Sequence, residues 1–381
     1  MIYLSPPHMS GYEEKYIKEA FDTNWIAPVG PNIDALEHEF CKRINVKYSV
    51  ALSSGTAALH LALRVLNIGQ GDFIFCSNFT FIASAAPILY QKATPVLIDS
   101  DSESWNMCPK LLDRALNDAS KDNKLPKAIV AVGLYGQSPD MKKILEISNH
   151  YNIPVIEDSA ESLGARYKNV ESGTMGKIGI FSFNGNKIIS GSGGGMLVSN
   201  NSSLVEKARK LSTQAREPVL HYEHKELGYN YRMSNIIAGI CRGQLKVLTQ
   251  RVEARRYIFK KYKDMLSSIK DIHWMPEPDW SYSSRWLSCF FINHDKNFKP
   301  SELISFLSSQ KIEARLLWKP LHLQPILEGT RLYSEVLPLT GKSFTEKLFD
   351  YGVCLPSGSN MTDDDIERVV SSIKSFFEKR V

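Results

Sequence analysis

Apolar residues fall along this chain in short compact runs that alternate with stretches of helical spacing. The run at 48–52 (YSVAL) is followed by a Ser-Ser-Gly-Thr turn and by helical spacing over 57–66. Further short runs stand at 72–76, 94–100, 127–135 and 153–158, with helical stretches at 81–91 and 141–151. Apolar runs bounded by turns are typical of buried strands. The alternation predicts an α/β fold with a mostly parallel sheet covered on both faces.

The second half of the chain begins in the same way and then becomes less regular. Two more strands are predicted at 177–184 and 194–200, around a glycine-rich loop, followed by a helix at 203–215. Helical spacing with a long polar face, from Ser234 to Met265, predicts a helix that connects two domains. The remaining predicted elements are a strand at 285–294, a helix at 301–310, an extended stretch at 312–318 and a final helix at 363–379.

Length and composition narrow the class of protein. A chain of 381 residues exceeds what one core usually supports. We therefore expect a large domain at 1–250, which includes a breaker-rich loop of fixed shape at 24–31, and a small domain at 251–381. The net charge of +5 is modest, and basic residues are interspersed with acidic ones. This pattern disfavours nucleic acid as a partner.

The six cysteines are scattered, without a C-x-x-C pair or zinc-ligand spacing, so we expect reduced, mostly buried thiols and no metal. The N-terminus lacks a basic region followed by an apolar run, and no apolar stretch is long enough for a bilayer. We therefore expect a cytoplasmic protein without a membrane segment.

Two motifs occupy positions where open α/β sheets bind ligands. The segment SSGTAALH (53–60) places backbone N–H groups and a hydroxyl at a predicted helix N-terminus, which favours an anion. An ordinary strand-to-helix turn would look the same. In IEDSAESLGA (156–165), Asp158 ends a predicted strand, where its carboxylate could keep a ring nitrogen protonated. A helix-capping role for Asp158 is the alternative.

Two further motifs follow in the chain. In FSFNGNKIISGSGGGM (181–196), Lys187 stands beside glycines that allow a planar ligand to approach, and lysine forms Schiff bases with carbonyls. The glycines do not match a dinucleotide fingerprint, because Met196 falls on its last glycine position and a strand follows. A nicotinamide dehydrogenase is therefore disfavoured. GYNYRMSN (228–235) opens a helix and could simply provide its cap.

These four motifs in this order resemble the DegT/DnrJ/EryC1/StrS family of sugar aminotransferases, from LSPPHM near the start to CLPSG near the end. The resemblance implies the aspartate aminotransferase-like fold of pyridoxal-phosphate enzymes. Its large domain has a mostly parallel seven-stranded sheet, and its smaller C-terminal domain is α+β. It also implies a homodimer with shared active sites, pyridoxal 5'-phosphate as cofactor and pyridoxamine phosphate as its intermediate form.

The resemblance assigns roles residue by residue. Lys187 matches the lysine that binds the cofactor covalently, and Asp158 matches the partner of its ring nitrogen. The other matching positions bind the phosphate, stack on the ring, or reach the neighbouring subunit's phosphate: Gly55, Thr56 and Ser182; Phe81; and Asn230. Glu161 departs from the family pattern, in which Gln or His is common near the cofactor's phenolic oxygen.

Within the family, the segments IAPVGP, SFNGNKII and GYNYRMSN are similar to the transaminases of UDP-N-acetylbacillosamine synthesis (EC 2.6.1.34). That subgroup transfers the amino group of L-glutamate to C4 of UDP-2-acetamido-2,6-dideoxy-4-ketohexose, releasing 2-oxoglutarate. Other nucleotide keto sugars remain alternatives: dTDP-3- or 4-keto-6-deoxyhexose and GDP-4-keto-6-deoxymannose. A pyridoxal-phosphate sugar dehydratase is disfavoured, because such relatives carry His in place of Lys187. A catalytically silent cofactor-binding protein is a further alternative.

A nucleotide sugar needs a cleft with groups that suit a diphosphate. Arginine and lysine have that chemistry. The candidate substrate-binding residues are Asn24, Ile26, Pro28, His224, Arg315, Trp318, Lys319 and His322. Core packing is the competing interpretation of Trp318, and a structural hydrogen bond is the competing interpretation of His322.

Overall fold

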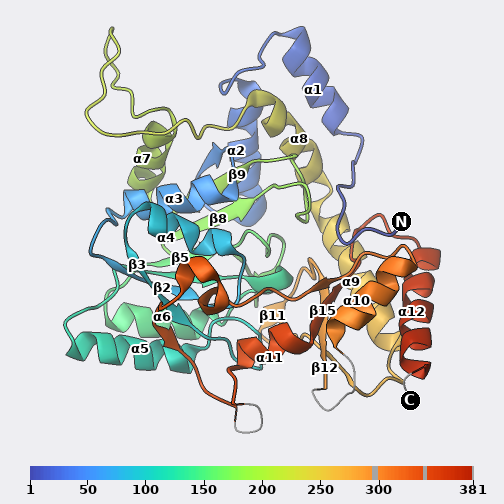
Figure 1. Cartoon of the computed structure of the whole chain (residues 1–381). Coiled ribbons are helices and arrows are strands. Elements are labelled where there is room, and N and C mark those ends of the chain that lie inside the picture. Colours follow the sequence, from blue (N-terminus) through green and yellow to red (C-terminus); the bar gives the residue numbers. More distant parts are fainter. Residues whose placement is uncertain (294–298, 338–340, 380–381) are drawn as a thin grey trace.

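A computed structural model describes residues 1–293, 299–337 and 341–379. Its centre is an eight-stranded sheet in the order β1-β9-β8-β5-β4-β2-β3-β14 (Figure 1). The strands are β1 (Tyr48–Leu52), β2 (Phe73–Ser77), β3 (Thr94–Ile98), β4 (Ala128–Val132), β5 (Val155–Asp158), β8 (Ile178–Ser182), β9 (Gly195–Ser199) and β14 (Leu332–Tyr333).

The sheet is mostly parallel, as the alternating pattern predicts. Only β9 runs against its neighbours, pairing antiparallel with both β1 and β8. The expected number of seven strands is one too few, because the two-residue strand β14 adds to the edge beside β3. Two residues carry no readable hydrophobic period, so the sequence could not reveal this strand.

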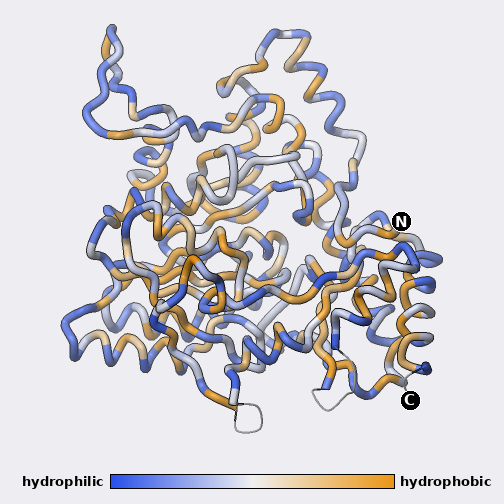
Figure 2. Tube along the Cα trace, viewed as in Figure 1, coloured by the Kyte–Doolittle hydropathy of each residue, from blue (hydrophilic) through white to orange (hydrophobic). Residues whose placement is uncertain are grey.

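Helices cover both faces of the sheet. Along β1, Val50 and Leu52 pack with α3 and α7 on one face, while Ala51 packs with α2 on the other. Helices α5 and α6 cover the second face beside β2–β5 (Figure 1). The helices of this part are α1 (Glu13–Asp22), α2 (Pro31–Ile44), α3 (Gly55–Val65), α4 (Ala86–Tyr90), α5 (Pro109–Lys121), α6 (Met141–His150), α7 (Ser202–Ser212) and α8 (Asn235–Lys246). Figure 2 shows hydrophobic residues concentrated along the central strands.

The C-terminal part has its own sheet, ordered β10-β12-β15-β13, packed with helices α9, α10 and α12. Its elements are α9 (Leu248–Met265), β10 (Ile272–Trp274), β12 (Ser288–Ile292), α10 (Pro300–Ser309), β13 (Arg315–Leu316), α11 (Phe344–Tyr351), β15 (Gly352–Leu355) and α12 (Asp363–Glu378). The chain's N-terminus joins this part, where the Ile2 N–H donates to the Lys311 carbonyl. The boundary expected near residue 250, between a large and a small domain, is a proposal.

Short elements complete the architecture. A three-stranded ribbon in the order β11-β6-β7 links the two parts. Its strands are β6 (Arg166–Tyr167), β7 (Val170–Glu171) and β11 (Ser281–Tyr282), and the 3-10 turns are η1 (Ile82–Ser84), η2 (Leu134–Gly136), η3 (Leu321–Leu323) and η4 (Pro325–Leu327).

The helices expected at 234–265 and 81–91 are each interrupted. At 234–265 the chain forms α8 and α9, separated at Val247, whose N–H donates to the Gln244 carbonyl in a tight turn. Val247 and Leu248 are both buried, so the change of direction keeps apolar side chains of both helices in the core. At 81–91, η1 precedes α4, and Pro87 in the first turn of α4 has no N–H to donate.

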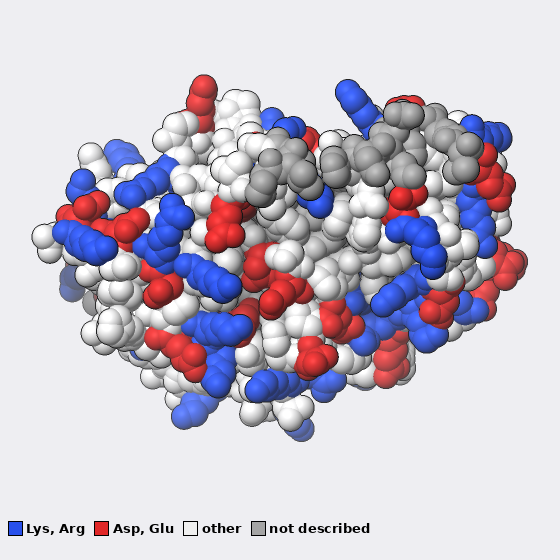
Figure 3. Space-filling model, turned by 90° about the horizontal axis from the view of Figure 1, so that it is seen from below, with Lys and Arg blue, Asp and Glu red and all other residues white. Residues whose placement is uncertain are grey.

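The surface carries mixed charge on the face seen in Figure 3, where basic and acidic side chains are interspersed. A loop at about 216–228 projects from the body, seen at the upper left of Figure 1. Its apolar residues are unusually exposed, with relative accessibilities of 105% at Leu220, 77% at Tyr222 and 74% at Leu227. Within the described ranges, no helix is both long enough and apolar enough to span a bilayer.

Candidate active site

A cavity of about 430 Å³ opens where β5 and β8 end and α3 begins. Three residues of the C-terminal part, Trp286, Arg315 and Trp318, also line it, so the cavity lies between the two parts of the chain. The predicted site residues among its lining are Gly55, Thr56, Phe81, Asp158, Glu161, Ser182, Lys187, Arg315 and Trp318. Residues spread over more than half of the chain therefore meet in one space.

One end of the cavity is suited to an anion. Ser54 caps α3 by accepting a hydrogen bond from the Ala57 N–H (3.0 Å), which leaves the Gly55 and Thr56 N–H groups at the free helix N-terminus. A Cβ on Gly55 would lie 2.9 Å from the Ser182 Cβ, so this position requires glycine. Among the described residues, neither the Thr56 nor the Ser182 hydroxyl has a hydrogen-bond partner. Free donors beside a helix N-terminus are the chemistry that a phosphate requires.

Asp158 is the last residue of β5 and lines the same cavity. Its carboxylate accepts hydrogen bonds from the Ser84 hydroxyl (2.7 Å) and the Ala160 N–H (3.2 Å). Burial raises the pKa of Asp158, while the Ser84 hydrogen bond and the charge of Lys187 act in the opposite direction. A buried carboxylate of this kind is stabilised by a ligand that brings a positive charge, such as a protonated ring nitrogen.

Lys187 lines the same cavity. Its Nζ is 3.8 Å from Glu161 Oε1 and 4.3 Å from the centroid of the Trp286 ring. The other oxygen of Glu161 accepts a hydrogen bond from the Tyr135 N–H at 2.9 Å. Burial raises the pKa of Glu161, and the nearby Lys187 charge opposes that shift. Glu161 is thus held beside the amine as its ion-pair partner.

Aromatic rings form a wall of the cavity. Phe81 is 48% exposed, and its ring centroid lies 5.2 Å from that of Trp318. Trp318 in turn stacks on Tyr135, with centroids 6.1 Å apart and planes 9° from parallel. Phe81 therefore offers a free ring face to a planar ligand.

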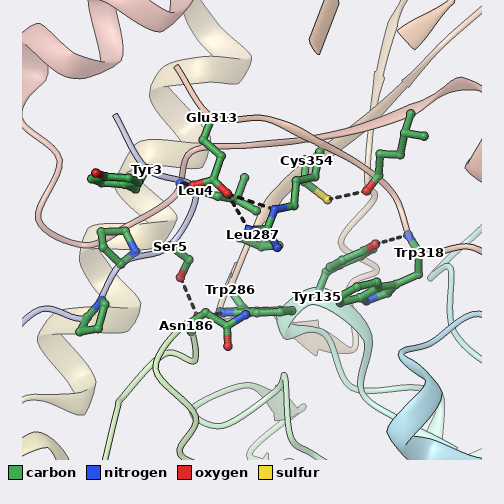
Figure 4. A pocket seen from close by; sticks show the side chains of 14 residues that line it. Tyr3, Leu4, Ser5, Tyr135, Asn186, Trp286, Leu287, Glu313, Trp318 and Cys354 are labelled. Atoms are coloured by element: carbon green, nitrogen blue, oxygen red, sulfur yellow. Dashed lines mark hydrogen bonds and ion pairs between the residues drawn. The ribbon is translucent and has the colours of Figure 1, made fainter. Parts of the chain in front are cut away.

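A second cavity of about 320 Å³ adjoins the first (Figure 4). The N-terminal segment Tyr3–Pro7 forms one side of it. The two cavities share Asn186, Trp286, Arg315 and Trp318. Their common wall carries Arg315, whose guanidinium donates to Glu313 Oε1 at 2.6 Å.

Several predicted substrate residues lie outside both cavities. In the loop at 24–31, Asn24, Ile26 and Pro28 are exposed. Asn235 holds this loop in place, because its side-chain amide donates to the Trp25 carbonyl and its N–H donates to the Ala27 carbonyl.

The projecting loop and the segment after it place His224 and Asn230 on the surface, away from the chain's own cavities. His224 Nδ1 lies 2.8 Å from the Gln214 carbonyl oxygen, and Asn230 pairs with Thr213 in a β-bridge.

Lys319 and His322 follow Trp318 but line neither cavity. His322 Nδ1 lies 3.0 Å from the Asn78 side-chain oxygen, and its Nε2 lies 3.9 Å from Glu346. This arrangement matches the structural hydrogen bond that was the competing interpretation of His322.

Three residues that sequence reasoning did not single out contribute directly to the site. Ser84 holds the Asp158 carboxylate, Trp286 lies against the Lys187 amine, and Asn186 joins the two cavities. Asn186 stands in the motif at 181–196 and Trp286 in the segment RWLS of a predicted strand, but neither residue was given a role from the sequence.

The model of the DegT/DnrJ/EryC1/StrS aminotransferase family matches residues 7–374. The chain belongs to this family of sugar aminotransferases. Such aminotransferases depend on pyridoxal phosphate, and the free hydroxyls at α3, the buried Asp158 and the exposed Phe81 ring fit that cofactor.

Curated relatives of this aminotransferase cover almost all of the chain. EpsN of Bacillus subtilis strain 168, whose own assignment as a pyridoxal phosphate-dependent aminotransferase is provisional, is 53% identical over 376 residues, 99% of this chain and 96% of EpsN. A GDP-perosamine synthase of Caulobacter vibrioides is 34% identical over 375 residues, 98% of this chain and 97% of that protein.

A solved structure of this family has the same fold. A DegT/DnrJ/EryC1/StrS aminotransferase from Brucella abortus superposes with a TM-score of 0.88 at 25% identity, covering 96% of this chain and 95% of that one.

Proposed function

We propose that this sugar aminotransferase moves the amino group of L-glutamate to C4 of a UDP-linked 4-keto-6-deoxy-N-acetylhexosamine, the reaction of EC 2.6.1.34. The observation that carries the proposal is one cavity lined by Lys187, by the anion-suited N-terminus of α3 and by the buried carboxylate of Asp158. The UDP sugar is supported by the segments similar to the bacillosamine subgroup, which extend from LSPPHM (4–9) to LPSG (355–358).

The chain's residues divide the work in this proposal. Gly55, Thr56 and Ser182 bind the cofactor's phosphate, Phe81 packs on its ring, and Asp158 keeps its ring nitrogen protonated. Bound pyridoxal phosphate supplies an electron sink for the bonds at the carbon that carries nitrogen.

Lys187 is the acid and base in both halves of the reaction. Its Nζ removes the proton from Cα of glutamate, and 2-oxoglutarate leaves. In the second half the same atom delivers a proton to C4 of the sugar. Glu161, 3.8 Å from Nζ, is the group with which Lys187 can exchange that proton.

We also propose a homodimer with shared active sites. The projecting loop exposes Leu220, Tyr222 and Leu227 to solvent, which is unfavourable for a lone chain. Asn230 and His224, together with the loop at 24–31, would then line the partner's cavity. Arg315, at the rim shared by the two cavities, suits the sugar's diphosphate or a glutamate carboxylate.

The test follows both half-reactions in the visible spectrum of the holoenzyme. Glutamate should remove the cofactor's absorbance band, and the UDP-4-keto sugar should restore it; Lys187→Ala should do neither. The GDP-perosamine synthases at 32–34% identity favour GDP-4-keto-6-deoxymannose as the second candidate substrate. Restoration by that sugar alone would replace the UDP assignment, and no response to glutamate would end the proposal of a glutamate donor.

A further inference from the structure

The peptide group that joins Asn186 to Lys187 is held by hydrogen bonds at both ends. Its carbonyl oxygen accepts from the Ser5 hydroxyl and from the Trp286 indole N–H, each at 2.7 Å. Its N–H, which belongs to Lys187, donates to the Asn184 carbonyl at 3.0 Å. The orientation of this peptide sets the direction in which the Lys187 side chain leaves the backbone.

The loop that carries Lys187 has backbone hydrogen bonds near its two ends, from the Phe183 N–H to the Gly194 carbonyl and from the Gly191 N–H to the Phe183 carbonyl. It connects β8 to β9 and contains Gly185, Gly191, Gly193 and Gly194, whose backbones are unusually free. The two donors come from far away in the chain, 181 positions away for Ser5 and 100 for Trp286. In Figure 4, Ser5 and Trp286 both approach Asn186 at the wall shared by the two cavities.

Arg255 of α9 contacts both Ser5 and Trp286, and it is 1% exposed. Its guanidinium donates to Ser5 Oγ (3.0 Å) and to the carbonyl oxygens of Trp286 (2.6 Å) and Ser357 (2.9 Å). Because arginine can only donate, Ser5 must accept from Arg255 and use its own hydrogen for Asn186. Arg255 therefore determines which way the Ser5 hydroxyl points.

Burial lowers the pKa of Arg255 to about 9, so the guanidinium stays charged at neutral pH. It forms no ion pair with a carboxylate among the described residues, and its hydrogen bonds go to uncharged oxygens. Its Nε has no hydrogen-bond partner among the described residues. A buried cation that has only uncharged partners costs stability, which favours a role in positioning those partners.

We propose that Ser5 and Trp286, oriented by Arg255, are positioning residues that fix the Asn186–Lys187 peptide and so hold the Lys187 amine at its working position. The inference rests on the proposed role of Lys187. Trp286 also contacts the Lys187 side chain directly, because its ring centroid lies 4.3 Å from the Lys187 Nζ.

The experiment compares Ser5→Ala, Trp286→Phe and the double variant. Phenylalanine keeps a ring against Lys187 and removes the N–H donor. Each single variant leaves one donor on the carbonyl, so kcat should fall by only about threefold. The double variant frees the peptide, and a misplaced reacting group can lower kcat by about a hundredfold. Ser5→Thr keeps the hydroxyl and should restore wild-type kcat.

Matched controls make the same chemical changes elsewhere. Ser199 is also buried and donates to a backbone carbonyl, that of Lys177 at 2.7 Å, so Ser199→Ala controls for Ser5→Ala. Trp274 packs between Phe259 and Phe290 in the C-terminal core, so Trp274→Phe controls for Trp286→Phe. Neither control should change kcat by more than about twofold.

A second measurement needs no turnover. In the cofactor-free protein, competitive acetylation with acetic anhydride, read by mass spectrometry, reports the reactivity of the Lys187 amine against pH. The double variant should change that profile and the singles should leave it near wild type. An unchanged profile, or a double-variant kcat equal to the product of the singles, would overturn the inference. Because the labelling requires neither cofactor nor substrate, it decides this point even if the proposed reaction is wrong.

Discussion

Removing the Ser182 hydroxyl should weaken cofactor binding without weakening the fold. The hydroxyl has no protein partner among the described residues, so Ser182→Ala breaks no internal hydrogen bond. The unfolding free energy of the cofactor-free protein should therefore change by less than about 0.5 kcal/mol. A hydrogen bond to a charged phosphate is worth about 1.5–3 kcal/mol. At about 1.4 kcal/mol per factor of ten, the Kd for pyridoxal phosphate should rise about 10- to 150-fold.

The assay titrates the cofactor-free protein with pyridoxal phosphate and follows quenching of tryptophan fluorescence, since Trp286 and Trp318 line the cavity. Pyridoxal, which lacks the phosphate, is the matched control ligand, and its affinity should be the same for wild type and Ser182→Ala. Urea titration of both cofactor-free proteins measures stability. Equal losses of affinity for the two ligands would refute the assignment of Ser182 to the phosphate. A large loss of stability would show that the hydroxyl has a structural role instead.

Three further predictions concern stability. Burial lowers the pKa of His60 to about 4. Between pH 6.5 and 4, His60 is therefore protonated in the unfolded chain but neutral in the folded one, and the unfolding free energy should fall by up to about 3 kcal/mol over this range. In urea titrations, His60→Gln should remove this dependence of the unfolding free energy on pH. Burial raises the pKa of Glu161, so the advantage of Glu161→Gln over wild type, measured without cofactor, should grow as pH rises above 4.5; a constant difference would contradict this sign. Glu37 pairs with Arg232 (2.6 Å) and Arg209 (2.8 Å), so Glu37→Ala should cost about 3–5 kcal/mol in chemical unfolding, whereas exposed Glu206→Ala should cost almost nothing.

Local patterns were sufficient for the architecture and for the chemistry at its centre. The periods of apolar residues depend on neighbours a few positions apart, so the order of strands and helices around the sheet could be predicted. The turn at Gly55 and Thr56, Asp158 at the end of β5 and Lys187 in its glycine-rich loop each carry a short-range signal. These residues lie in one cavity because parallel strands bring their carboxyl ends to the same edge of the sheet.

Substrate contacts were predicted from residue type alone, and the structure separates those residues. Arg315 and Trp318 line the cavities, whereas His322 lies between Asn78 and Glu346. A histidine has the same side chain in either place, so only its tertiary neighbours distinguish a ligand from a structural hydrogen bond.

The sequence by itself determined the fold class and the family and pointed to the candidate site residues, because all three rest on short motifs whose residues lie close together in the chain. Only the tertiary structure decided what holds those residues in place. Ser84 reaches Asp158 across 74 positions, and Ser5 and Trp286 meet at Asn186 from opposite parts of the chain. Such contacts leave no local signature, since a hydrogen bond depends on where two distant segments pack and not on the residues beside either partner.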